Sequence, residues 1–325
     1  MRLRQLLRRV LPWLVSAALL VYVFGWLTEW DKLLEATQRA NAPIFVLVTF
    51  ADKMIFFLFW TMLQVQAVRR MVGPMPLKRL ISLRGGSELL RSISNPLADA
   101  AFLIGLVRIT RGSPGRVILA ASVPGFVHAI VLIGQVTLAL FLLEGGLSAN
   151  RDVAIAAAIG WSIILGILFS VRFARRSTGR WLARVRMWLE QVEFRAFLPM
   201  LGWFVLLAFM DIGVQWIATW AFGAPIPFLE LVARVPILYA AFMIPSFGNF
   251  GTRELAWAAL FGDFHDRDTL VAYAFATNSL FLIFHVVIGI AFLPRAIGLL
   301  RQVRAASREG EDLPGGPLVH DPSDP

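Results

Sequence analysis

The chain has 325 residues, of which 58% are hydrophobic and only 16% are charged, and its formal net charge is +10. A soluble domain uses about 25% charged residues to cover its surface, so this composition excludes an ordinary soluble protein and indicates that lipid covers most of the surface. The absence of cysteine excludes disulfides and thiolate metal sites. The four histidines are scattered without the spacing of metal ligands, so we predict no metal site and no cofactor.

Six apolar stretches reach the length of ~20 residues that a helix needs to cross a bilayer core. They cover residues 12–30, 43–66, 117–143, 153–171, 197–222 and 269–293. The first follows a basic N-terminus, but it is long for a signal peptide and lacks a small-residue cleavage site, so we interpret it as a signal anchor. The sequence therefore predicts an all-α polytopic membrane protein with about six transmembrane helices in a single transmembrane domain over residues 1–300.

The connections between these stretches alternate in charge. Of the 31 lysines and arginines, 24 lie in the segments 2–9, 69–116, 172–195 and 295–308. The positive-inside rule places these segments in the cytoplasm, and the neutral or acidic connections outside. Both termini are therefore predicted to be cytoplasmic. No basic soluble domain remains to bind nucleic acid.

Two moderately apolar regions, residues 76–108 and 228–262, do not fit as membrane crossings. If either region crossed the membrane fully, an arginine-rich segment would lie on the outer side, against the positive-inside rule. Each region has room for two half-helices and contains glycine, so we predict two re-entrant hairpins, whose backbone needs protein or water around it. Residues 12–143 and 153–293 then form two inverted repeats, as in many transporters. The pattern G-x-x-E-L, which occurs in each hairpin, agrees with this arrangement.

Two further segments are predicted on the cytoplasmic side. Residues 181–192 place apolar side chains at helical spacing among arginines, which predicts a helix in the membrane interface. We interpret it as an anchor, with a lipid sensor as the alternative. Residues 306–325 are rich in proline, glycine and aspartate and poor in apolar residues, so a disordered tail is predicted.

Several ionisable side chains lie at predicted membrane depth, where each costs about 2.5–3.5 kcal/mol unless it is paired or hydrated. They are Asp52, Lys53, Glu88, Arg91, Asp211, Arg253 and Glu254. Asp52 and Lys53 are neighbours on a helix and point about 100° apart, which favours interhelical ion pairs over one shared ligand. Asp211 is a candidate proton relay or a partner of Lys53. His128 and His285 lie on apolar stretches and are interpreted as interior residues.

The two glycine-containing hairpins carry the functional hypothesis. A half-helix that begins after glycine offers free N–H groups and a positive dipole end to an anion such as phosphate. Arginines beside it favour phosphate further, because a guanidinium group binds two oxygens at once. The predicted substrate-binding residues are Gly85, Gly86, Glu88, Arg91, Gly248, Asn249, Gly251, Arg253 and Glu254. In the alternative interpretation, Glu88 and Glu254 only cap their own half-helices.

The second hairpin resembles a known family. Its sequence from Pro245 to Glu254 is similar to the motif P-x-x-G-G-x-G-x-x-E of the lysylphosphatidylglycerol synthase transmembrane-region, or flippase-like, family, with Asn249 in place of the second glycine. The first hairpin resembles the family's G-E-x-x-R element through Glu88 and Arg91, with Ser87 in place of the glycine.

The resemblance covers about residues 12–300 and implies that the protein binds or translocates a lipid with a phosphate-bearing headgroup. Two features of the family are absent from this sequence. The E-R-x-x-D pattern that often follows the first hairpin is replaced by other residues at 121–128, and no soluble aminoacyl-transferase domain follows in this sequence. Lipid aminoacylation is therefore not implied.

Together these observations predict a bacterial inner-membrane transporter of flippase type that moves a phospholipid or a polyprenyl-phosphate-linked lipid. Its partners would be membrane lipids with anionic headgroups, and a homo-oligomer is compatible with the sequence. Two alternatives stay open. An intramembrane lipid-pyrophosphate phosphatase would need a nucleophile, but Ser87, Ser92 and Ser94 lack the flanking arginine cluster of phosphoryl transfer. The second alternative is an accessory subunit that does not itself transport lipid.

Overall fold

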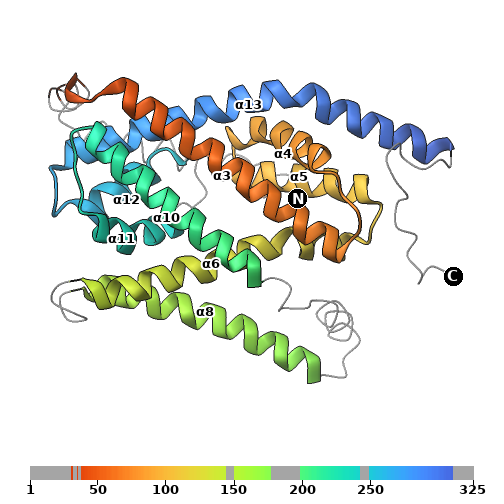
Figure 1. Ribbon diagram of the computed structural model, residues 1–325, viewed down its shortest axis with the longest axis horizontal. Helices are drawn as coiled ribbons and strands as arrows, with labels where there is room; N and C mark the ends of the chain where they lie inside the picture. Colours follow the sequence, from red (N-terminus) through yellow and green to blue (C-terminus); the bar gives the residue numbers. More distant parts are fainter. Residues whose placement is uncertain are drawn as a thin grey trace, which may run out of the picture. The chain divides into compact units, whose positions relative to one another are not determined.

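In the computed structural model, all regular secondary structure of the described residues is helical (Figure 1). The structure describes Asp31, Glu35 and residues 38–143, 150–176, 198–241 and 249–309. Within them, five helices are long and apolar enough to cross a membrane. They are α3 (Ala42–Met71), α6 (Pro114–Leu142), α8 (Arg151–Arg176), α10 (Leu198–Ala221) and α13 (Arg267–Glu309). The prediction of an all-α polytopic membrane protein is confirmed at this level.

These five helices coincide with five of the predicted apolar stretches. The 30 residues of α3 span about 45 Å at 1.5 Å per residue, which exceeds a hydrocarbon core of about 30 Å. The predicted anchor at 12–30 and the predicted interfacial helix at 181–192 lie outside the described residues. The predicted start of the disordered tail is wrong: residues 306–309 form the end of α13, because alanine, arginine and glutamate continue a helix easily.

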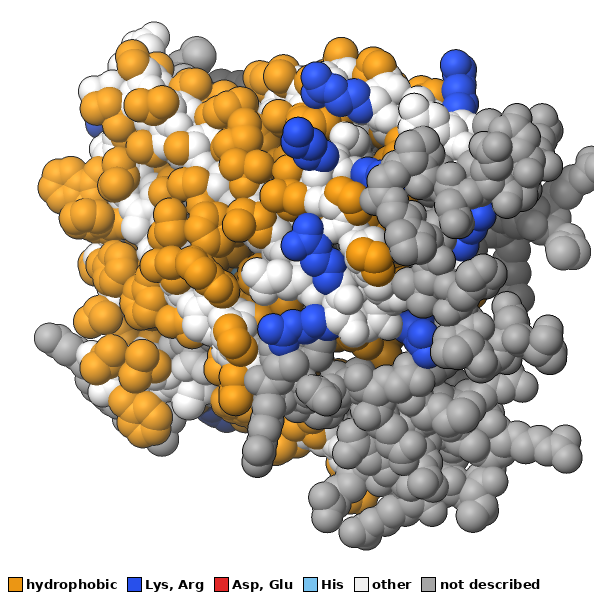
Figure 2. All heavy atoms as spheres, turned by 45° about the vertical axis from the view of Figure 1, so that its right-hand side comes forward, with side chains coloured by type: hydrophobic (Ala, Val, Ile, Leu, Met, Phe, Trp, Pro, Cys, Tyr) orange, Lys and Arg blue, Asp and Glu red, His pale blue; other side chains and the backbone are white. Residues whose placement is uncertain are grey.

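The outer surface of the long helices is apolar. Leu47 on α3 is 69% exposed, Phe141 on α6 is 81% exposed and Phe169 on α8 is 70% exposed. Figure 2 shows one face of the molecule on which hydrophobic side chains predominate, with lysines and arginines gathered over part of it. Large exposed apolar patches mark surfaces that contact something other than water, and lipid is the solvent that fits helices of this length.

Two pairs of short helices lie between the long ones in the chain. α4 (Leu77–Arg91) and α5 (Asn95–Thr110) cover the first predicted hairpin region, and α11 (Phe228–Ala241) and α12 (Thr252–Phe261) cover the second. The longest of the four has 16 residues and measures about 24 Å, which is shorter than the bilayer core. Short helices are therefore present where half-helices were predicted, while the re-entrant path and the inverted repeat stay predictions.

The glycines of the first hairpin do not begin a half-helix, so this part of the prediction is wrong. Gly85 and Gly86 lie in the middle of α4, and the chain leaves the helix only at residues 92–94. Glu88 accordingly lies in the last turn of α4 and does not cap a helix N-terminus. Helical hydrogen bonding continues through the two glycines because the chain on both sides favours helix, and Gly85 serves packing instead.

The packing that requires glycine is the close approach of α4 and α13. A Cβ atom at Gly85 would lie 2.5 Å from the ring of Phe292. A Cβ atom at Gly289 would lie 2.5 Å from the backbone nitrogen of Leu89. Helices in membranes use small residues in this way to bring their backbones together. The glycines of α4 and α13 thus hold Glu88 close to the face of α13.

Gly289→Ala is expected to reduce the stability of the protein by about 1–3 kcal/mol, because the added methyl group meets the backbone of α4, which cannot rotate away. Gly213→Ala in α10 is the matched control, since a Cβ atom there has nothing within 4 Å. Thermal unfolding of the purified protein in detergent measures both variants. Equal unfolding midpoints would contradict the close approach.

The described chain divides into two compact units, each assembled from separate segments. Unit 1 draws on Met1–Phe57, Gly85–Ala101 and Phe209–Leu293, and unit 2 on Leu58–Arg84, Phe102–Ala208 and Pro294–Pro325. Both units take residues from each predicted repeat. The units therefore follow contacts between distant segments and not the order of the chain.

Each unit has its own core. In unit 2, α3, α4, α5, α6 and the end of α13 contribute buried aliphatic side chains, among them Val68, Leu106 and Val117, which are fully buried. In unit 1 the core is aromatic, with ring centroids of Phe45 and Tyr273 5.8 Å apart and those of Trp257 and Tyr273 4.7 Å apart. Every charged residue predicted at membrane depth belongs to unit 1.

Candidate functional site

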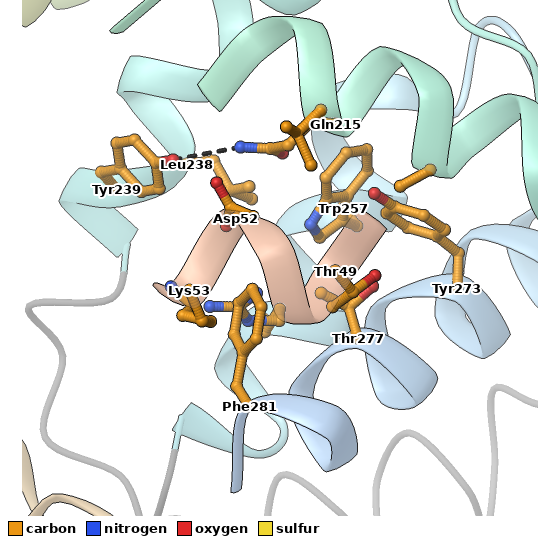
Figure 3. Close-up of a pocket in the computed structure, with 13 residues that line it drawn as sticks. Thr49, Asp52, Lys53, Gln215, Leu238, Tyr239, Trp257, Tyr273, Thr277 and Phe281 are labelled. Atoms are coloured by element: carbon orange, nitrogen blue, oxygen red, sulfur yellow. Dashed lines mark hydrogen bonds between the residues drawn. The ribbon is translucent and has the colours of Figure 1, made fainter. Parts of the chain in front are cut away.

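Polar and apolar side chains of unit 1 line a small cavity (Figure 3). Side chains from α3, α10, α11, α12 and α13 line it, and they include Asp52, Lys53 and Arg253 of the predicted site. The cavity has a volume of about 30 Å³. Since one water molecule needs about 10–15 Å³ on the same measure, the space suits about two waters.

Helix α3 directs its two charged residues to different partners, as their 100° separation predicts. Figure 3 shows Asp52 on the side of Tyr239 and Gln215, and Lys53 on the side of Phe281. The amine of Lys53 lies 3.7 Å from the centroid of the Phe281 ring. One turn of helix therefore supplies a carboxyl group to one wall of the cavity and an ammonium group to another.

Gln215 and Tyr239, which line the cavity, belong to a hydrogen-bonded cluster around Asp211. The phenol of Tyr239 donates to Asp211, and the amide of Gln215 donates to Asp211 at 3.1 Å and to the Tyr239 oxygen at 3.0 Å. Asp52 interacts electrostatically with Asp211. Asp52 is 7% exposed and Asp211 is 6% exposed. Asp211 thus bonds to Tyr239 and Gln215, whereas the predicted alternative was a pair with Lys53.

The cationic side of the cavity brings Lys53 and Arg253 to one aromatic ring. The guanidinium carbon of Arg253 lies 4.6 Å from the centroid of Phe281, the same ring that Lys53 approaches. Arg253 is 7% exposed, and Lys53 is partly buried. Each contact is a cation–π interaction, which gains strength where water is excluded. Two cations at one ring also repel each other, so the site favours a nearby negative charge.

Arg253 lies in the first turn of α12, which begins directly after Gly251, as the sequence predicted for a helix in this region. Gly251 caps the helix with φ of 82°, and its N–H donates to Glu254 at 2.6 Å. The alternative interpretation of Glu254 as a cap of its own helix is thus correct in geometry. Asn249 has φ of 62°, a left-handed conformation that asparagine tolerates better than other non-glycine residues. Gly248 lies outside the described residues.

Glu88 and Arg91 form a second cluster in unit 1. Arg91 lies 3.2 Å from Glu88 and 2.7 Å from Asp99, and the ring nitrogen Nδ1 of His285 lies 2.7 Å from Glu88. Glu88 is 3% exposed, whereas Asp99 is 57% exposed at its side chain. Glu88 also interacts electrostatically with Lys53, which connects this cluster to the cavity.

Comparison of the chain with protein-family models, with curated proteins and with solved structures found no match. Its function is therefore argued from the site itself. In the part of the chain with a described structure, no group of three histidine or carboxylate side chains could hold a metal ion.

Sequence reasoning missed three residues that the structure adds to the two clusters. His285 was interpreted as an interior residue, and Tyr239 and Gln215 were not singled out. A signal was present for Tyr239, because the chain has only three tyrosines in 325 residues and two of them, Tyr239 and Tyr273, line the cavity. A rare phenol on an apolar helix usually has a polar partner.

Proposed function

We propose that this protein moves a lipid with a phosphate-bearing headgroup across the membrane, as a transporter of flippase type. The observation that carries the proposal is the pair of cations, Lys53 and Arg253, which meet at one aromatic ring and both line the cavity. A phosphate between them would relieve their mutual repulsion, and the planar guanidinium group of Arg253 matches two phosphate oxygens. The resemblance of both hairpins to the flippase-like family supports the same substrate class.

The size of the cavity fits a transporter in a closed state. A volume of about 30 Å³ admits water but not a lipid headgroup. The headgroup therefore enters only after the helices around the cavity separate, while the acyl chains stay in lipid. Binding near broken helices between moving bundles is the common plan of secondary transporters.

The proposed architecture has six spans, with residues 12–30 as the first. The pairs α4 with α5 and α11 with α12 are the re-entrant hairpins of two inverted repeats, and both termini are cytoplasmic in a bacterial inner membrane. The short helices in both regions and the arginine-rich connections support this plan. The cap at Gly251 supports a helix start at the cavity in the second hairpin.

The test is transport by the purified full chain in liposomes that contain a fluorescent phosphatidylglycerol. We expect the protein to make the label in both leaflets accessible to an external quencher, and to act more weakly on a labelled lipid that lacks phosphate. Empty liposomes are the control. Release of inorganic phosphate from a polyprenyl pyrophosphate would instead show a phosphatase. No movement of any anionic lipid would contradict transport and favour an accessory subunit.

A further inference from the structure

Exposed lysines and arginines gather at one end of unit 2. The buried core of this unit joins the ends of α3 and α5, the starts of α4 and α6 and the last part of α13 through Val68, Ile109, Leu80, Val117 and Val303. The exposed cations on these segments include Arg69, Arg70, Lys78, Arg108, Arg111 and Arg301, which we call the basic cluster. None of these six residues lines the cavity described above.

Acidic residues are scarce in the described part of unit 2, where the basic cluster lies. Residues 58–84 and 102–143 contain eight lysines and arginines but no aspartate or glutamate. The acidic residues of its other described segments are Asp152, at the start of α8, and Glu309, the last residue of α13. On the face that Figure 2 shows, lysines and arginines lie beside hydrophobic side chains and no acidic side chain is in view. Since like charges repel, the cluster favours an anion from outside the chain.

Helix dipoles explain only part of the basic cluster. Arg69 and Arg108 lie in the last turns of α3 and α5, where the dipole favours a cation. Lys78 and Arg116 lie in the first turns of α4 and α6, where the dipole disfavours a cation and favours an anion. Neither of these first turns contains an acidic residue. The two positive helix ends and the cations beside them therefore attract the same kind of ligand, an anion.

Exposed apolar side chains continue from the basic cluster along the same helix faces. On α5, Arg108 lies four positions after Ile104, which is 56% exposed, and on α13, Arg301 lies four positions after Ile297, which is 41% exposed. Residues four apart are neighbours on one face of a helix. On α3, Met62 is 46% exposed and lies two turns before the arginines of the last turn. This order of cation and apolar surface matches the headgroup and acyl chains of a phospholipid, whereas a soluble acidic partner would leave the isoleucines without contact.

We propose that the basic cluster binds the headgroup of an anionic phospholipid of the surrounding membrane, whose acyl chains lie along the exposed apolar side chains of α5 and α13. This lipid is a bound neighbour of unit 2 and not the transported substrate, so its binding goes beyond the proposed function and does not depend on it. A phosphate that contacts cations from several helices reduces their mutual repulsion. The bound lipid therefore stabilises the folded protein, because a ligand of the folded state shifts unfolding to a higher temperature.

The net charge of the headgroup decides which lipid binds. Phosphatidylglycerol has a phosphate without a counter-charge, whereas the quaternary ammonium group of phosphatidylcholine cancels the charge of its phosphate. Each basic residue near a membrane surface strengthens the attraction to an anionic lipid by about fivefold. Because the cations of the basic cluster are exposed, salt weakens this preference, while it screens the buried Arg253 of the cavity much less.

Native mass spectrometry of the purified full chain tests the proposal. After detergent exchange has removed bound lipid, the protein is offered equal amounts of phosphatidylglycerol and phosphatidylcholine with the same acyl chains. We expect the wild type to retain phosphatidylglycerol over phosphatidylcholine by about fivefold, and the combined variant Arg69→Gln, Arg108→Gln and Arg301→Gln to retain both about equally. The matched control is Arg151→Gln with Arg267→Gln, since both arginines are exposed but lie at the starts of α8 and α13. Equal retention by the wild type, or a preference that survives in the folded combined variant, would overturn the proposal.

A second measurement needs no variant. At low salt, phosphatidylglycerol should raise the thermal unfolding midpoint of the wild type more than phosphatidylcholine does, and at about 1 M salt, where the Debye length is about 3 Å, this difference should vanish. A difference that persists at high salt would show that exposed cations do not hold the lipid. Glycerol phosphate, which has similar headgroup chemistry but no acyl chains, should not stabilise the protein at the same concentration. If it does, the cluster binds a soluble anion and the assignment to a lipid is wrong.

Arg253→Gln separates this lipid from the lipid of the cavity. At low salt the variant should keep the preference for phosphatidylglycerol, because Arg253 belongs to unit 1 and the basic cluster to unit 2. Loss of all preference in Arg253→Gln would place the lipid in the cavity alone, which overturns the lipid at the basic cluster and leaves the proposed function standing. If the wild type moves no lipid in liposomes, the proposed function fails, and lipid retention still decides the basic cluster.

Discussion

Arg253→Gln is expected to reduce the affinity for a phosphate-bearing lipid by about a hundredfold, equivalent to about 2.7 kcal/mol. Arg253 is 7% exposed, shares Phe281 with Lys53 and lines the cavity, so glutamine removes both the charge and the planar fork from the proposed phosphate site. A hydrogen bond to a charged group contributes about 1.5–3 kcal/mol, and phosphate would lose two. Binding of labelled phosphatidylglycerol to the purified protein measures the loss.

Arg253→Lys separates charge from shape at the same position. Lysine keeps the positive charge but loses the fork that holds two oxygens, so we expect about a tenfold loss, or about 1.4 kcal/mol. The controls are Arg267→Gln and Arg267→Lys, because Arg267 is exposed at the start of α13 in the same unit. Wild-type binding by both Arg253 variants, with unchanged size-exclusion profiles, would show that this arginine does not hold the lipid.

Glu88→Ala is expected to destabilise the protein by about 3–5 kcal/mol, the usual effect of removing one partner from a buried ion pair. The carboxylate of Glu88 is 3% exposed and accepts from both Arg91 and His285, so alanine leaves two polar groups of α4 and α13 without their common partner. Thermal unfolding in detergent measures the change. Glu88→Gln should lose less, because the amide oxygen still accepts one hydrogen bond.

Asp99→Ala is the matched control for Glu88→Ala, because Asp99 pairs with the same arginine but its side chain is 57% exposed. An exposed ion pair contributes about 0–1 kcal/mol, so the unfolding midpoint should barely change. Equal effects of the two alanine substitutions would mean that burial does not distinguish the two carboxylates. The network of Glu88 would then be a surface feature and not part of the interior of unit 1.

Three conclusions were accessible from the sequence because their physics is local. A run of apolar residues long enough to cross a bilayer is visible in any window, and five predicted spans recur as α3, α6, α8, α10 and α13. The charges at membrane depth had to turn inward, and all seven belong to unit 1. The cap of α12 involves residues only three positions apart, Gly251 and Glu254, and the glycine pattern predicted it.

The tertiary structure decided which residues meet, since partners far apart in the chain leave no local pattern. Glu88 and His285 are 197 positions apart, and Asp211 and Tyr239 are 28 apart. Gly85 looked like the start of a half-helix because glycine breaks helices in water, but the approach of Phe292 on α13 gives it a packing role instead. The sequence alone thus determined that charges lie within an apolar helical protein, and packing decided that Asp52, Lys53 and Arg253 share one cavity.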